Sequence, residues 1–147
     1  MPRKLRLLLA DDDQNFHLIF RHAMTAAKAE ACELEEVFDG TQAVDYVLGN
    51  PPYDDRQKYP PPDLVLLDQR MGSMDGSEAL AKIKSDPRFL ALPVGIMTTS
   101  SQPKLHELCY KNGAAFCVVK PMSFAALSLK IETLVDFATT VLDLPRS

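Results

Sequence analysis

The chain has 147 residues, of which 46% are hydrophobic and 24% are charged, and its formal net charge is −4. At roughly 100–200 residues per domain, this length predicts one domain, and the composition is too apolar for a disordered chain. No apolar run approaches the ~20 residues that cross a bilayer, and the first residues do not resemble a signal peptide. The acidic balance argues against a nucleic-acid binder. Three cysteines, an odd number without a close pair, favour reduced thiols and a cytoplasmic protein.

Short apolar runs alternate with helical patterns along the chain. The run 5–10 is nearly continuous in apolar residues, which is typical of a strand buried on both faces of a parallel sheet. Residues 49–62 contain five prolines and are expected to form a loop. The other expected strands are 34–38 (an edge strand), 63–68, 93–98 and 115–119, and helices are expected near 15–29, 41–48, 77–85, 103–111 and from 123 onward.

Five strands alternating with five helices predict a doubly wound α/β fold with a five-stranded parallel sheet. Ligands of such sheets bind outside the carboxyl ends of the strands. The polar residues at those ends are Asp11, Asp12, Asp13, Asp39, Asp68, Thr98, Thr99 and Lys120.

The residue types at these strand ends are suited to phosphoryl chemistry. Carboxylates that share one rim repel each other unless a cation compensates, and oxygen ligands favour Mg²⁺. A carboxylate beside such an ion can attack a phosphoryl group, while a hydroxyl and an ammonium bind the phosphoryl oxygens. Taken singly, Asp13 is an ordinary helix N-cap and Lys120 an ordinary surface charge. Only their joint appearance favours a functional site.

Four segments in order resemble the response-regulator receiver domain of chemotaxis-type proteins over about residues 5–135. They are LLLADDD, PDLVLLDQRMGSMDG, PVGIMTTSS and GAAFCVVKP. The resemblance implies a flavodoxin-like sheet with strand order 2-1-3-4-5. It also implies a receiver domain over 1–136 and a tail over 137–147 that is too short for an output domain.

The resemblance implies a role for individual residues. Asp68 is expected to be the phosphorylated aspartate, with Mg²⁺ bound by Asp12 directly, by Asp11 mainly through water, by Asp68, and by the backbone carbonyl of Arg70.

The resemblance also assigns the residues that contact the phosphoryl group. Thr98 is expected to be the switch hydroxyl and Lys120 to pair with Asp68. The peptide bond between Lys120 and Pro121 is expected to be cis.

Three features depart from the family pattern, and one of them is Arg70, two residues past Asp68, which with Ser100, two residues past Thr98, is expected to border the path of hydrolytic water. Cys117 stands where the family usually has a Tyr or Phe that moves with the switch hydroxyl, and Phe116 beside it should point to the opposite face of the sheet. Gly72 stands where Pro is common, which should loosen the loop after the phosphoacceptor strand.

The proline-rich segment NPPYDDRQKYPPPD, the segment KSDPRFLALPV and the tail FATTVLDLP resemble the response regulators paired with bacterial and cyanobacterial phytochrome kinases. This resemblance implies a phytochrome histidine kinase as partner, with at least one of Phe16, Phe20 and Met122 exposed for docking, although Phe20 is alternatively a core residue. It also implies a homodimer through the face of the fourth helix, fifth strand and fifth helix. The candidates on that face are Leu105, Leu108, Phe116, Val118, Phe124 and Leu127, joined by Phe137, Val141, Leu142 and Leu144 of the tail unless these pack on their own domain.

The sequence therefore predicts a single-domain response regulator that is phosphorylated on Asp68 and signals by protein contact or dimerisation, as a switch and not a turnover enzyme. A pseudo-receiver that binds partners without phosphorylation, or a phosphate sink in a phosphorelay, is the alternative. A haloacid-dehalogenase-type phosphatase is disfavoured, because such enzymes place a second Asp where this chain has Arg70.

Overall fold

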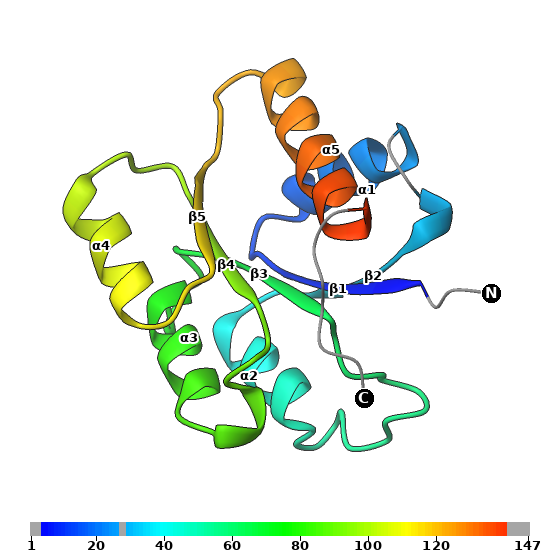
Figure 1. Ribbon diagram of the computed structural model, residues 1–147, viewed down its shortest axis with the longest axis vertical. Coiled ribbons are helices and arrows are strands. Elements are labelled where there is room, and N and C mark those ends of the chain that lie inside the picture. The colour runs from blue at the N-terminus through cyan, green and yellow to red at the C-terminus, as the bar shows by residue number, and fades with distance from the viewer. Residues whose placement is uncertain (1–3, 27–28, 141–147) are drawn as a thin grey trace.

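The sheet has five parallel strands in the order β2-β1-β3-β4-β5 in the computed structural model, which describes residues 4–26 and 29–140 (Figure 1). The strands are β1 (Leu5–Ala10), β2 (Cys32–Val37), β3 (Leu64–Asp68), β4 (Val94–Thr98) and β5 (Phe116–Val119). The predicted order is confirmed, and β2 lies at an edge as expected. Strands β1, β3 and β4 are apolar along nearly their whole length because helices cover both faces of the sheet.

The described residues form five α-helices, which lie in two layers. These are α1 (Gln14–Ala26), α2 (Gly40–Leu48), α3 (Gly76–Lys84), α4 (Pro103–Lys111) and α5 (Phe124–Thr140), with short 3-10 helices η1 (Ala29–Ala31) and η2 (Pro87–Phe89). Helices α1 and α5 cover one face of the sheet, and α2, α3 and α4 cover the other (Figure 1). Helix α5 continues to Thr140, so residues 137–140, predicted as tail, belong to this helix. No helix in the described ranges is long and apolar enough to cross a membrane.

Aspartates after the strands start the helices at the carboxyl edge of the sheet. The Asp13 carboxylate accepts the N–H of Asn15 at 2.9 Å at the start of α1, which confirms the predicted cap. Asp39 caps α2 and Asp75 caps α3 in the same way. Each cap satisfies a helix N–H that has no partner within the helix, so the strand-to-helix turns beside the site are well defined.

The proline-rich segment between α2 and β3 is a loop, as predicted, and it is organised around Arg56. The guanidinium of Arg56 donates hydrogen bonds to the carbonyl oxygens of Tyr46, Val47, Tyr53 and Tyr59 at 2.8–3.3 Å. The rings of the three tyrosines pack on one another. One half-buried cation therefore replaces the regular hydrogen bonding that prolines forbid.

The prediction of a cis peptide bond before Pro121 is wrong. Within the described residues the cis bond is the one between Pro51 and Pro52, and the bond between Lys120 and Pro121 is trans. The trans form is the intrinsically preferred isomer by about 0.5–1 kcal/mol, and here β5 and α5 are connected without the cis form.

Candidate functional site

A pocket of about 290 Å³ lies at the carboxyl edge of the sheet. Its wall is formed by Asp11, Asp12, Asp13, Asp68, Gln69, Arg70, Thr98, Thr99 and Lys120. Every residue expected to bind Mg²⁺ or the phosphoryl group is in this set, whereas Asp39, also at a strand end, caps α2 instead. The strand order explains why, because β1, β3, β4 and β5 are consecutive neighbours and their carboxyl ends meet at one rim.

Lys120 connects the two central carboxylates of the pocket. Its Nζ lies 2.6 Å from Oδ2 of Asp11 and 3.2 Å from Oδ1 of Asp68. The backbone N–H of Lys120 also donates to the carbonyl oxygen of Thr98 at 2.7 Å, which extends the β4–β5 ladder into the site. The lysine side chain is only 13% exposed, so these ion pairs are partly desolvated and stronger than surface pairs.

The carboxyl group of Asp68 has a perturbed pKa. Burial and the negative charge of Asp11 raise the pKa from 3.8 to about 6, while Lys120 opposes the shift. A carboxylate that is destabilised in this way attracts a cation or reacts as a nucleophile more readily than a solvated one.

The carboxylates of Asp11, Asp12 and Asp68 form a group that fits a metal ion, because one oxygen from each lies within 4.8 Å of the others. The three carboxylates differ in how far other groups of the protein already occupy their oxygens. Oδ1 of Asp11 accepts the N–H of Asp13 at 2.9 Å and Oδ2 accepts from Lys120, so both of its oxygens are engaged. Asp12 is exposed, and its carboxylate makes no hydrogen bond or ion pair within the described part of the chain. This oxygen-only set matches the preference of Mg²⁺.

The Thr98 side chain is buried at the end of β4 and faces the same pocket. Its hydroxyl oxygen accepts the N–H of Ser100 at 3.0 Å, so the hydroxyl hydrogen is available to another acceptor. The β4 strand ends here because Thr99 begins the turn toward α4.

The loop after β3 contains two of the residues at which the sequence departs from the family pattern, Arg70 and Gly72. Gly72 has a φ of 66°, a left-handed conformation that Pro cannot adopt, which explains the glycine. Arg70 borders the pocket with an exposed side chain, and the guanidinium makes no ion pair with any described residue.

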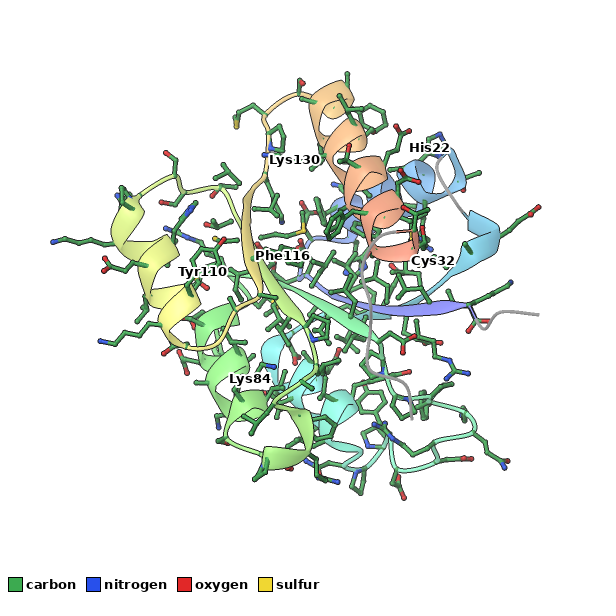
Figure 2. All side chains as sticks on the ribbon, viewed as in Figure 1. His22, Cys32, Lys84, Tyr110, Phe116 and Lys130 are labelled. Atoms are coloured by element: carbon green, nitrogen blue, oxygen red, sulfur yellow. The ribbon has the colours of Figure 1, made fainter. Side chains whose placement is uncertain are left out.

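Cys117 and Phe116 point to opposite faces of the sheet, as alternation predicts. Cys117 packs against the core under α2, α3 and α4, whereas Phe116 packs against the core under α1 and α5. On the side of the sheet that α4 covers, the small Cys117 side chain therefore takes the place of the aromatic ring that the family usually has. The hydroxyl of Tyr110 on α4 instead accepts the backbone N–H of Cys117 at 3.1 Å, and Figure 2 shows Tyr110 beside β5.

Two contacts of the site come from α1 and were not predicted. They involve His17, and Phe16, which was expected only as a docking residue. Nε2 of His17 lies 2.8 Å from the carbonyl oxygen of Asp11, and Nδ1 lies 2.6 Å from Oε2 of Glu36. The ring of Phe16 lies under the Lys120 ammonium, 4.0 Å from Nζ to the ring centroid. Helical periodicity places both residues on the inner face of α1, but nothing in the sequence indicates which strand end they contact.

The chain matches the family model "Response regulator receiver domain" over residues 7–132. It is 31% identical to the response regulator Rcp1 of Synechocystis, covering 74% of this chain and 76% of that protein. Among solved structures, the phosphorylated cyanobacterial phytochrome response regulator RcpA has a TM-score of 0.90 and 25% identity, covering 98% of this chain and all of the other (100%). RPA3017, described as acting in red light signaling of R. palustris, has a TM-score of 0.88 and 29% identity, with 97% and 99% covered. In two longer curated proteins, the chain spans only 17% and 10% of the length.

The parallel sheet has the strand order of a response-regulator receiver domain, and its pocket holds acidic side chains that a lysine bridges. The chain belongs to that family. Within the family it is related to the response regulators of phytochromes.

Proposed function

We propose that the chain is a phosphoacceptor switch in which Asp68 accepts a phosphoryl group from a histidine kinase in a reaction that requires Mg²⁺. The observation that carries the proposal is the arrangement around Asp68. Its carboxylate, with a pKa raised to about 6, lies 3.2 Å from the Lys120 ammonium and beside the carboxylates of Asp11 and Asp12.

In this reaction an oxygen of Asp68 attacks the phosphorus of the kinase phosphohistidine. A new bond forms between that oxygen and phosphorus, and the bond between phosphorus and the imidazole nitrogen breaks, leaving its electron pair on the imidazole. Lys120 binds an oxygen of the transferred group, and Thr98, which lines the same pocket, donates its hydroxyl to another.

We assign the Mg²⁺ site to Asp12, Asp68 and the backbone carbonyl of Arg70, with Asp11 acting through water. The engagement of both Asp11 oxygens by Asp13 and Lys120 supports this indirect role. When bound, Mg²⁺ neutralises charge on the carboxylates and on the transferred phosphoryl oxygens.

The test is incubation of the purified chain with acetyl phosphate and Mg²⁺, followed by intact-mass measurement. We expect the mass of one phosphoryl group to be gained, the gain to disappear on chelation of Mg²⁺, and the Asp68→Asn variant to gain none. A wild-type chain that gains no mass would contradict the phosphoacceptor function and favour the pseudo-receiver.

We further propose a phytochrome histidine kinase as the partner, on the basis of the similarity to Rcp1 and RcpA. Of the three residues expected at the docking surface, Phe16 and Phe20 are buried and Met122 is 99% exposed. Met122 directly follows the Lys120-Pro121 segment, so it is suited to contact a kinase helix next to the site. We also propose a cytoplasmic location for this chain. Its three free thiols agree with that location, because cytoplasmic thiols are kept reduced.

Signalling through a homodimer is the other part of the proposal. An apolar groove of about 820 Å³ runs between β5 and α5, and its wall includes Phe116, Leu129 and Phe137. The last two side chains are 63% and 49% exposed, an apolar surface that favours association. Lys130 of α5 lies at the same groove and donates to the carbonyl oxygen of Val119 (Figure 2). The predicted tail residues Val141, Leu142 and Leu144 lie outside the described residues.

A further inference from the structure

The ammonium of Lys120 is held on three sides: by Oδ2 of Asp11 at 2.6 Å, by Oδ1 of Asp68 at 3.2 Å and by the ring of Phe16, with 4.0 Å from Nζ to the centroid. We propose that Phe16 is a positioning residue for Lys120, whose ring face holds the ammonium toward Asp68 and thereby increases the rate of phosphoryl transfer. This inference rests on the proposed function, because the rate that it concerns is that of Asp68 phosphorylation.

The contact between the ring and the ammonium is attractive for a physical reason. The face of an aromatic ring carries partial negative charge, and a cation within about 6 Å of the centroid is drawn to it. The attraction is stronger when water is displaced, and the Lys120 side chain is only 13% exposed. An ammonium has three N–H donors, so two carboxylates alone do not fix its position. The ring closes a side from which water would otherwise compete.

Phe16 itself is held firmly. It is the third residue of α1, its side chain is 3% exposed, and its ring packs on that of Phe20 one turn later, with centroids 6.2 Å apart. The next residue, His17, is tied to the carbonyl oxygen of Asp11 at 2.8 Å, and the helix is capped by Asp13. The position of the ring is therefore set by the backbone of α1, which is fixed to the same strand end that carries the acidic pair.

Without the ring, Lys120 would keep its two carboxylate partners while its long, flexible side chain gained freedom. We expect the ammonium to spend less time where it stabilises the transferred phosphoryl oxygens. Loss of the contact is expected to slow phosphorylation about three- to tenfold, which is the rate equivalent of an ordinary cation–π interaction.

The sharpest test changes the electrons of the ring and leaves its shape. Site-specific incorporation of phenylalanines carrying one, two and three fluorines at position 16 weakens the negative ring face stepwise at nearly constant volume. The full-length proteins are phosphorylated with acetyl phosphate at saturating Mg²⁺, and the rate is followed by intact mass. We expect the rate to fall with each added fluorine. The same substitutions at Phe20, which packs on Phe16, serve as the matched control and should leave the rate unchanged.

A second readout does not depend on phosphorylation. Because Nζ of Lys120 lies 4.0 Å from the centroid of the Phe16 ring, we expect the ring current to shift the NMR signals of the adjacent methylene protons upfield. Phe16→Leu keeps an apolar side chain without a ring and should return these signals to ordinary lysine positions. This measurement reports the contact even in a protein that proves to be inactive.

The possible outcomes separate the two proposals. A wild type that is never phosphorylated contradicts the proposed function, and the positioning role with it. A wild type that is phosphorylated at the same rate as all of the position-16 fluorinated proteins overturns the positioning role alone. A loss of rate that is equal for fluorination at Phe16 and at Phe20 would assign the effect to general packing and would also overturn it.

Discussion

At the scale of single residues, the negative charge of Asp68 is unfavourable in the folded protein. The Asp68 carboxylate is partly buried beside Asp11 and Asp12, and the Lys120 ammonium compensates only in part, so the pKa of Asp68 stays at about 6. An unbound carboxylate in this position weakens the fold, because the folded state holds the Asp68 proton more tightly than the unfolded chain does.

Asp68→Asn should therefore stabilise the protein in the absence of Mg²⁺. The pKa of Asp68 is raised, so its cost to the fold is absent below about pH 4, develops as the pH rises toward about 6, and is complete above that value. We expect the variant to be more stable than the wild type by about 1–3 kcal/mol near neutral pH, since one pKa unit corresponds to about 1.4 kcal/mol. Urea unfolding in the presence of a chelator measures the difference.

The control for this prediction is the same comparison of wild type and Asp68→Asn at lower pH. Near pH 4 the advantage of Asp68→Asn should vanish, because Asp68 is then protonated in the folded wild type and no longer costs stability. Addition of Mg²⁺ should raise the stability of the wild type more than that of the variant, through binding to the folded state. An advantage of the same size at both pH values would contradict the electrostatic explanation.

At the scale of elements, β4 and β5 pack through a glycine that the strand pattern does not explain. A Cβ atom on Gly95 would lie 2.2 Å from the ring of Phe116 on the neighbouring strand. The ring fills the space above Gly95 and forms part of the core under α1 and α5. Gly95 is therefore required for packing, not for backbone conformation.

Gly95→Ala should destabilise the protein by about 1–3 kcal/mol, the usual cost of overpacking a core. Denaturant unfolding checks the value. In the double variant with Phe116→Leu the smaller neighbour should make the added methyl less costly, so the two changes should be strongly non-additive. Additive effects would mean that Phe116 is not what excludes a side chain at position 95.

The loop between α2 and β3 is the other element whose structure depends on one side chain. Replacement of Arg56 by lysine keeps a cation but cannot reproduce a planar group that donates to four carbonyl oxygens. We expect Arg56→Lys to lower the free energy of unfolding by about 1–3 kcal/mol, because buried carbonyls lose their donors. Limited proteolysis should show faster cleavage within residues 49–62. A variant as resistant as the wild type would show that the prolines and tyrosines suffice.

At the scale of the whole molecule, the acidic pocket at the carboxyl edge of the sheet and the apolar groove are separate surfaces that share β5. The strand ends at the site through Lys120, and its Phe116 and Val118 line the groove toward α5. A displacement of β5 is therefore able to affect both surfaces, which is the requirement for a phosphorylation signal that is read through association.

If the groove forms the dimer contact, Leu129→Glu should shift the protein toward monomer. A charged side chain at this 63% exposed position would have to be desolvated in the interface. Sedimentation velocity, with and without beryllofluoride and Mg²⁺, measures the shift. Leu18→Glu is the matched control, since Leu18 is 58% exposed on α1, away from the groove. Equal association of the wild type and Leu129→Glu would exclude this face.

The sequence by itself determined the five strands, their alternation with helices and the residues at the strand ends. These features are local: apolar runs, Asp caps, and the Gly and Pro positions that stop each element. Because carboxyl ends of parallel strands share one edge, the sequence also predicted that Asp11, Asp12, Asp68, Thr98 and Lys120 would meet, and these residues line one pocket in the structure.

Only the tertiary structure decided which side chains brace that pocket. The ring of Phe16 under Lys120 and the bond from His17 to Asp11 depend on how α1 lies against strand ends, and the fit of Phe116 over Gly95 depends on inter-strand register. The anchoring of the loop by Arg56 is likewise set by contacts beyond the local segment, since Arg56 reaches back to carbonyl oxygens of α2. Periodicity specifies the face on which a residue lies, whereas its partner is set by packing between segments far apart in the chain.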